Sequence, residues 1–245
     1  MTPDQQFDNA NLTRAESILL DDAIAREGNR LIAMTLQRPN GTVLELDEKI
    51  IGRLFMIPDG STVWARAIGE KADAPGGWNV QASNILLAED EESSVIAFHE
   101  NLNGSTWGEA LHVRRFILAN NAPEHLGTVA FGLMAINAYR LGFGYISLFA
   151  AGHGPLRPGD IDAFVGFDVW PKLGFDAPIT PVELNRSPLT ELAGARTVQD
   201  VITIAPQWWA AHGTGRIMHF DLTAKSRNWA ILLHYLYVAL VERRS

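Results

Sequence analysis

The sequence of 245 residues contains no cysteine. This absence excludes disulfide scaffolds, cysteine nucleophiles and thiolate metal sites, and it is consistent with a reducing compartment. Basic residues are also few, since 20 Lys and Arg stand against 28 Asp and Glu and the formal net charge is -8. Nucleic-acid-binding domains normally carry a basic surplus or stripe, so we expect no nucleic-acid partner.

A targeting or membrane-spanning segment is not visible in the sequence. Residues 1–6 have neither the basic region nor the apolar region of a secretory signal. The longest apolar run, residues 229–241, is interrupted by His234 and is shorter than the roughly 20 apolar residues that a bilayer span requires. We therefore expect a cytoplasmic protein without membrane association.

Several motifs with a known chemistry are missing as well. The seven histidines never form the His-x-x-x-His pair that places two metal ligands on one helix face, so no metal site is predicted. The Gly-x-Ser-x-Gly turn of serine hydrolases does not occur. No internal repeat or low-complexity segment is present, which excludes repeat architectures.

The N-terminal part of the chain predicts one helix. Thr13 and Glu16 have the spacing of a capping box and precede an apolar run, so the helix is expected to begin there and to end near Gly28.

Two β-hairpins are predicted next. The first pairs residues 31–37 with 42–46 around a Pro-Asn-Gly turn, and the second pairs residues 53–57 with 62–66. Residues 71–79 contain an Ala-Pro-Gly-Gly sequence, which indicates a loop.

The middle of the chain predicts a strand–helix–strand unit. Strand-like runs cover residues 93–99, 110–118 and 145–150, and residues 126–141 have the three-to-four spacing of an amphipathic helix that Gly142 ends. A helix that connects two neighbouring strands in this way normally makes a right-handed crossover between parallel strands. The predicted fold class is therefore mixed α/β.

Two segments carry a family resemblance. In residues 115–151 a strand leads through a glycine-containing turn into a helix and a second strand, and residues 166–176 predict a short helix that ends in Trp-Pro-Lys-Leu-Gly-Phe. This order resembles the cofactor-binding half of the GNAT superfamily of N-acetyltransferases, over roughly residues 90–178. The resemblance implies a GNAT-like, mostly antiparallel twisted sheet with flanking helices.

The same resemblance suggests how the chain is divided. Residues 1–50 would form an N-terminal helix and extension, residues 51–178 the GNAT-like core, and residues 179–245 a C-terminal extension. Residues 226–241 predict a helix that is apolar on nearly all sides. Such a helix is either deeply buried or shared with a neighbouring chain, so a homodimer contact through it is a hypothesis.

In function, the resemblance implies an acyl-CoA-dependent N-acyltransferase that acts on an amine of a small molecule, a peptide or a protein. A helix N-terminus binds the anionic pyrophosphate of acetyl-CoA through its N–H groups, and a strand can hold the pantetheine arm. The implied cofactor contacts are Phe116, Ile117, Leu118, Leu126, Gly127, Thr128 and Val129. Glu109 or His112 would be the base, although on a regular strand they face opposite sides and only one can reach the cleft. His153 and Arg157 are the implied substrate contacts.

The sequence departs from the family pattern at the cofactor turn and at the usual acid. Residues 119–137 contain neither Lys nor Arg, and Glu124 occupies a position where the family has a cation or an amide. Trp170 stands in place of the tyrosine that protonates the thiolate, with Tyr145 or Tyr139 as substitutes. These departures leave two alternatives open: a catalytically inactive GNAT-like domain that binds a protein or peptide, and a cleft for another ligand.

Overall fold

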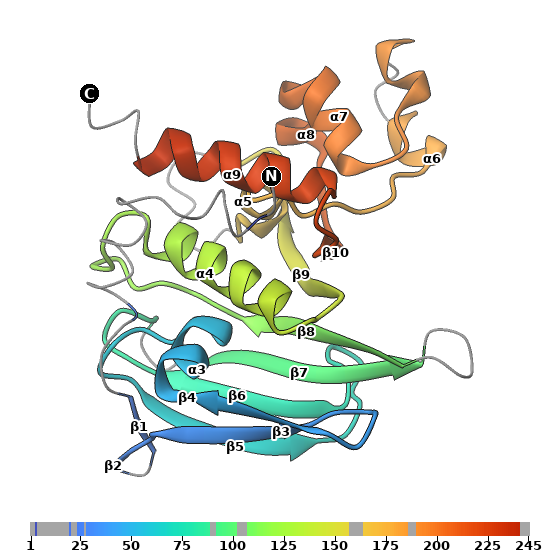
Figure 1. Ribbon diagram of the computed structural model, residues 1–245. Coiled ribbons are helices and arrows are strands. Elements are labelled where there is room, and N and C mark those ends of the chain that lie inside the picture. The colour runs from blue at the N-terminus through green and yellow to red at the C-terminus, as the bar shows by residue number, and fades with distance from the viewer. Residues whose placement is uncertain are drawn as a thin grey trace.

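A central eight-stranded sheet organises the molecule. The computed structural model describes Pro3, Leu20 and residues 24–26, 28–88, 92–101, 107–156, 164–185 and 190–240. The strand order in the sheet is β10-β9-β8-β7-β6-β5-β1-β2, and the helices α4 and α9 lie along one side of it (Figure 1). The sheet is mixed and mostly antiparallel, which confirms the mixed α/β prediction.

The strands are short at the β1–β2 edge and long in the centre. Their bounds are β1 Ala25–Arg26, β2 Asn29–Arg30, β5 Thr62–Ile68, β6 Gly77–Ser83, β7 Ser93–Asn101, β8 Trp107–Arg115, β9 Tyr145–His153 and β10 Thr214–Asp221. Among the strands of the described residues, only the β8–β9 and β1–β5 pairs are parallel. A separate two-stranded hairpin consists of β3 (Ala33–Gln37) and β4 (Val43–Asp47).

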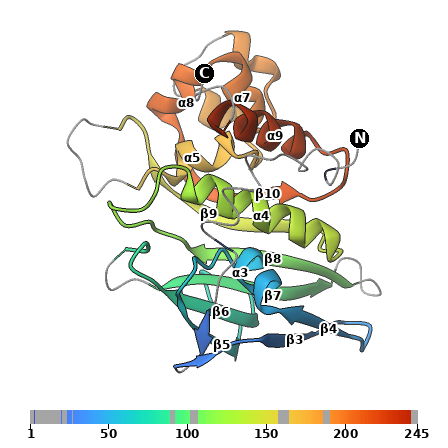
Figure 2. The same ribbon diagram turned by 60° about the vertical axis from the view of Figure 1, so that its left-hand side comes forward.

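The helices fall into two groups. The bounds are α3 Glu48–Leu54, α4 Leu126–Arg140, α5 Gly166–Lys172, α6 Pro181–Leu184, the 3-10 helix η1 Thr190–Gly194, α7 Val198–Ile204, α8 Pro206–His212 and α9 Arg227–Leu240. α3 and α4 pack together against the sheet, whereas α6, α7 and α8 gather beyond α5 at the β10 end (Figure 2). Within the described ranges, no helix has the length and apolar character needed to cross a membrane.

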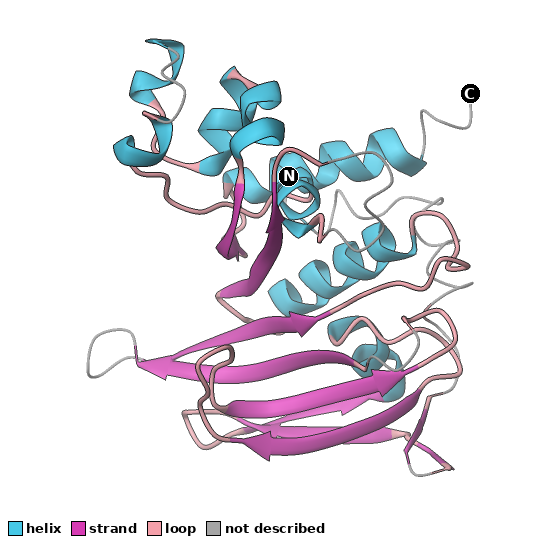
Figure 3. Ribbon diagram, turned by 180° about the vertical axis from the view of Figure 1, so that it is seen from behind, coloured by secondary structure: helices cyan, strands magenta, loops and turns pink. Residues whose placement is uncertain are grey.

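The core lies between the sheet and α4. Leu111 and Val113 of β8 and Ile146 and Leu148 of β9 point to this side and join one buried cluster with α4. On the other face, a smaller cluster of Ala74, Ile96, Phe98 and Ala110 lies beneath the loop before β6. Seen from behind, the long helices lie above the larger part of the sheet, and the short helix α3 lies behind its strands (Figure 3). The two faces of β8 and β9 therefore have different surroundings.

Most predicted elements agree with the structure. The first hairpin, the helix that begins at Leu126, the parallel crossover between β8 and β9 and the C-terminal helix are all confirmed. α9 buries Trp229, Leu232 and Leu236 within the chain's own core, while Tyr237 is exposed on its outer side. The homodimer contact stays a prediction.

The second predicted hairpin is wrong. Residues 48–54 form α3 rather than leading into a strand, and β5 pairs with β6, part of which was predicted as loop. The side chain of Asp47 caps α3 by accepting a hydrogen bond from the N–H of Ile50 at 2.8 Å, and Ile51 and Leu54 bury one face of the helix. The Asp47 cap and the buried face of the helix therefore favour α3, although the apolar run at its end is also typical of a strand.

Several element boundaries also differ from prediction. β8 ends at Arg115, so residues 116–118 lie beyond it. Residues 25–26 form β1 although the N-terminal helix was expected to continue to Gly28, and the predicted start of that helix lies outside the described residues.

One buried glutamine fastens the helical extension to the core, and we predict that its loss destabilises the protein. The Gln199 amide donates hydrogen bonds to the carbonyls of Pro171 (2.6 Å) and Phe175 (2.8 Å). Gln199→Leu leaves both buried carbonyls without a donor and is expected to lower the free energy of unfolding by about 2 kcal/mol. Urea denaturation measures this loss. Gln207→Leu, at an exposed position of α8, is the matched control and should change stability by less than about 0.5 kcal/mol.

Candidate functional site

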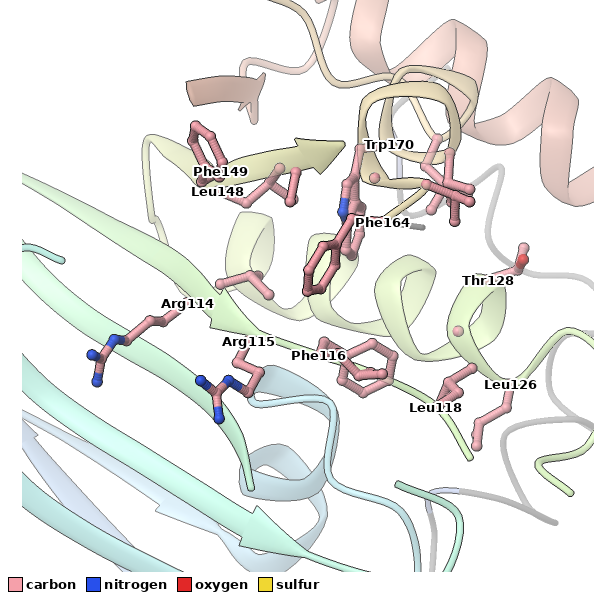
Figure 4. Close-up of a pocket in the computed structure, with 18 of the residues that line it drawn as sticks. Arg114, Arg115, Phe116, Leu118, Leu126, Thr128, Leu148, Phe149, Phe164 and Trp170 are labelled. Carbon is pink, nitrogen blue, oxygen red and sulfur yellow. The ribbon is translucent and has the colours of Figure 1, made fainter. Parts of the chain in front are cut away.

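A cavity of about 680 Å³ lies where β8 and β9 separate (Figure 4). The two parallel strands pair only from Ala110 and Tyr145 to Val113 and Leu148, although each continues beyond that point. The register between β7 and β8 shifts here, because Val95 pairs with Val113 but Ser94 pairs with Arg115. Such a bulge bends a strand and increases its twist, which accounts for the divergence.

The first wall of the cavity is the chain that continues from β8. Residues 116–118 stay extended because their backbone pairs with the segment after β6: the N–H of Ala88 donates to the carbonyl of Ile117, and that of Ala119 to the carbonyl of Leu86, both at 3.0 Å. Phe116 and Leu118 lie side by side along this wall in Figure 4. Residues 116–118 therefore form an extended, apolar ledge that runs from the end of β8 toward α4.

The N-terminal turn of α4 forms one end of the cavity. His125 precedes the helix in the left-handed conformation with φ 67°, and its side chain makes no capping bond. The N–H of Leu126 donates to Pro123 and that of Val129 to His125, whereas no hydrogen bond is found within the described residues for the N–H groups of Gly127 and Thr128. Two helix N–H groups thus remain available to an anion.

Gly127 lets this turn lie close to the extended ledge. A Cβ atom at Gly127 would come 3.3 Å from Cδ1 of Leu118 and 3.7 Å from Cε1 of Phe116. The glycine therefore brings the helix N-terminus and the apolar ledge to one place.

The remaining wall comes from β9, α5 and the residues before α5. Phe164, Val165 and Trp170 cover the cavity from this side, and Phe164 projects toward the ledge in Figure 4. The Trp170 indole packs edge-on against Phe131 and Phe175, with ring centroids 6.0 and 5.4 Å apart. Trp170 therefore contributes a rigid apolar surface where the family's tyrosine was expected.

The basic groups of the cavity come from β8 rather than from the helix turn. Arg114 and Arg115 line it, and Arg114 donates two hydrogen bonds, of 2.9 and 2.7 Å, to one carboxylate oxygen of Asp73. Glu124 is 80% exposed and lies 3.4 Å from the ring of His125, so its charge is directed at that imidazole. The sequence signal for these cations is the Arg114-Arg115 pair at the end of β8, which lies before the turn at residues 119–125.

Six of the seven predicted cofactor residues line this one cavity. They are Phe116, Ile117, Leu118, Leu126, Gly127 and Thr128. Val129 differs, because its side chain is buried in the core and its N–H is already bonded to His125. His153 lies at the end of β9, exposed, with Nδ1 3.2 Å from the carbonyl oxygen of Gly154, and it does not line the cavity. Arg157 lies outside the described residues.

The two predicted bases face opposite sides of β8, as their spacing required, and neither lines the cavity. The carboxylate of Glu109 lies 3.5 Å from Nε of Arg38 and 3.6 Å from Nε2 of His99. His112 is 5% exposed, its Nδ1 lies 3.0 Å from Oγ of Ser147, and it is hydrogen-bonded to the backbone of Asp73. Burial lowers the pKa of His112. Both side chains are occupied by protein partners, which speaks against a role in proton transfer.

Potential metal ligands are not clustered in the described residues. Within the described part of the chain, no three His, Asp or Glu side chains gather in a way that could hold a metal ion. The chain matches no protein-family model, and no similar protein was found among curated proteins or solved structures. Function must therefore be inferred from the cavity and the groups around it.

Proposed function

We propose that the chain is an acyl-CoA-dependent N-acyltransferase with a GNAT-like core. The observation that carries this proposal is the cavity between the diverging parallel strands β8 and β9, with the N-terminus of α4 at one end. Its volume is in the range of about 300–1,000 Å³ that small-molecule and cofactor sites occupy.

The residues of the cavity fit the parts of an acyl-CoA in order. The free N–H groups of Gly127 and Thr128, together with the helix dipole, suit the pyrophosphate. The extended segment 116–118 suits the pantetheine arm, which is itself extended and partly apolar. Bound acyl-CoA would supply an activated thioester, and the opening between β8 and β9 is where its acyl end would be held.

Transfer is expected to be direct. Without cysteine, a thioester-linked acyl-enzyme cannot form, so direct attack of the acceptor amine on the bound thioester is the expected route. The indole of Trp170 is not an acid of the strength that a thiolate requires, so the departing sulfur is expected to take its proton from water.

The test of this proposal is calorimetric titration with acetyl-CoA. The wild-type protein is expected to bind in the micromolar range, and Gly127→Glu is expected to weaken binding at least about tenfold, because it places a carboxylate where the phosphates bind. Gly194→Glu is the matched control: it adds the same charge at an exposed glycine with open space around it and should leave binding unchanged. No binding at millimolar acetyl-CoA would contradict the proposal.

A second candidate function has its own support. Beyond Val113 and Leu148 no pairing between β8 and β9 is found in the described residues, and the exposed aromatic side chains Phe149 (55%) and Phe164 (61%) lie beside this opening. An extended peptide could pair with such strand edges and place apolar side chains between them. A protein without acetyl-CoA binding would be assigned to this peptide-binding, catalytically inactive class.

A further inference from the structure

A histidine from the C-terminal part of the chain lies beside the opening on the sheet face opposite α4. His219 of β10 pairs in register with Ser147 of β9, which pairs in turn with His112 of β8. These three residues form one row across the sheet, on the same face. His219 is exposed, unlike His112 and Ser147, which are buried.

The next row leads into the cavity. Phe149, which lines the cavity, pairs with Ile217, and both lie two residues along their strands from the row of His219. At about 3.3 Å per residue, the two rows are roughly 7 Å apart. His219 also lies one strand beyond β9, about 5 Å to the side, so an amine bound between its ring and the point where β8 and β9 separate would span both offsets.

Two neighbours define the surroundings of the His219 ring. The ring of Tyr145 contacts it edge-on at a centroid distance of 5.3 Å, and the Tyr145 hydroxyl is hydrogen-bonded to the carboxylate of Glu100. The Glu100 charge acts on both side chains, and the His112 imidazole lies near enough to interact with His219. An imidazole, a phenol and a carboxylate from three different strands are thus gathered at one place.

The backbone of His219 is fixed while its ring remains available. The N–H of His219 donates to the carbonyl of Asp176, the N–H of Asp176 donates back to the carbonyl of His219, both at 2.9 Å, and the Asn228 amide donates to that same carbonyl at 3.3 Å. In the described part of the chain, no hydrogen bond occupies either ring nitrogen of His219. His112 differs, because its ring nitrogen Nδ1 already contacts Oγ of Ser147.

We propose that His219 is the base that accepts the proton of the attacking amine, with Tyr145 and Glu100 as positioning residues. The inference rests on the proposed acyltransferase function. As the amine nitrogen bonds to the thioester carbonyl carbon, one N–H proton moves to the imidazole of His219. The carbon–sulfur bond then breaks, the thiolate takes a proton from water to leave as CoA, and the imidazolium returns its proton to the solvent.

The electrostatic surroundings are compatible with this role. Partial burial lowers the pKa of His219, and the Glu100 carboxylate opposes this shift, so the imidazole is neutral at pH 7 and can accept a proton. Burial and Glu100 both raise the pKa of Tyr145, so its hydroxyl keeps its proton and continues to donate to Glu100.

The experiment compares wild type with His219→Gln and with His234→Gln, a control at an exposed position of α9. Acetyl-CoA binding is measured by calorimetry, and CoA thiol release is followed from pH 5.5 to 9 with aniline as the probe acceptor, because this aromatic amine stays largely unprotonated over that range and its own titration does not mask that of His219. His219→Gln is expected to bind acetyl-CoA like wild type and to release thiol about 100-fold more slowly, as loss of a general base predicts. His234→Gln should behave like wild type in both assays.

The pH dependence of the thiol-release rate and its rescue by imidazole distinguish a general base from a residue with only a structural role. Because the pKa of His219 is lowered from its ordinary value of 6.5, the wild-type rate should hold as the pH falls to about 6.5 and decline below it. His219→Gln should lose this acidic limb, and added imidazole should restore part of the rate of His219→Ala. Equal thiol release by wild type and His219→Gln, whatever its rate, would overturn the assignment of His219. Since acetyl-CoA binding is measured separately, that result differs from a failure of the acyltransferase proposal.

Discussion

Phe131→Ala is expected to lower the free energy of unfolding by about 3–5 kcal/mol, the range seen when a large aromatic side chain is removed from a core. Phe131 is fully buried on α4, and its ring lies 5.0 Å from Phe175, 5.4 Å from Phe220 and 6.0 Å from Trp170. These partners belong to the α5 region and to β10. Phe131 is therefore the point where α4 holds the second half of the molecule, and urea denaturation should show the loss directly.

A matched control separates burial from aromaticity. Phe149→Ala removes the same side chain from an exposed position of β9, 55% accessible, and should change stability by less than about 1 kcal/mol. Phe131→Ala should also shift the near-ultraviolet signal of Trp170, whose indole packs on the lost ring. A stability loss similar to that of Phe149→Ala would mean that the aromatic cluster does not hold α4 to α5 and β10.

Apolar spacing and length predict the helix from Leu126 and the strand from Tyr145. Their burial is broader than a single face, since α4 is buried at every position from Val129 to Ala138 and β9 at Ile146–Leu148. The short connection between them favours the parallel crossover that the structure contains. The Pro-Asn-Gly turn likewise specifies the β3–β4 hairpin without information from the rest of the chain.

Elements whose conformation depends on tertiary contacts could not be predicted from local sequence patterns. Residues 54–57 form an apolar run that suits either a strand or a helix end, and the Asp47 cap together with burial of Ile51 favours a helix that ends at Leu54. β6 begins at Gly77 and its first residues have the composition of a loop, yet it pairs with both β5 and β7. Its neighbours, rather than its own residues, make it a strand.

The same distinction applies to the site. Contacts made by consecutive residues, such as segment 116–118 and the turn at Gly127, were predictable because the crossover brings them together. The proposed base could not be predicted, since a sequence shows neither that the ring of His112 is occupied nor that His219, far along the chain, pairs with Ser147. Assigning that role required the order of strands in the sheet.

Gly152→Ala is expected to destabilise the protein by more than about 3 kcal/mol and to weaken acetyl-CoA binding at the same time. Gly152 lies near the end of β9 with φ 103°, a conformation that side chains rarely adopt. A Cβ atom there would come within 1.7 Å of the carbonyl oxygen of Phe164. Because this contact is to backbone, rotating a side chain cannot relieve it, and the segment around Phe164 has to move.

That segment is a wall of the cavity, which couples stability to binding. Phe164, Val165 and Gly166 all line the space between β8 and β9, so a displacement at Gly152 changes the shape of the site itself. Gly142→Ala is the matched control, because Gly142 has a similar positive φ of 84° but open space around it. The control should cost about 1 kcal/mol, the penalty of the left-handed conformation alone, and leave acetyl-CoA binding unchanged. Equal stability losses for the two variants in urea denaturation would show that Gly152 is not required for the close approach to Phe164. A larger loss for Gly152→Ala, together with weaker acetyl-CoA binding, would identify Gly152 as the residue that lets this wall close over the cavity.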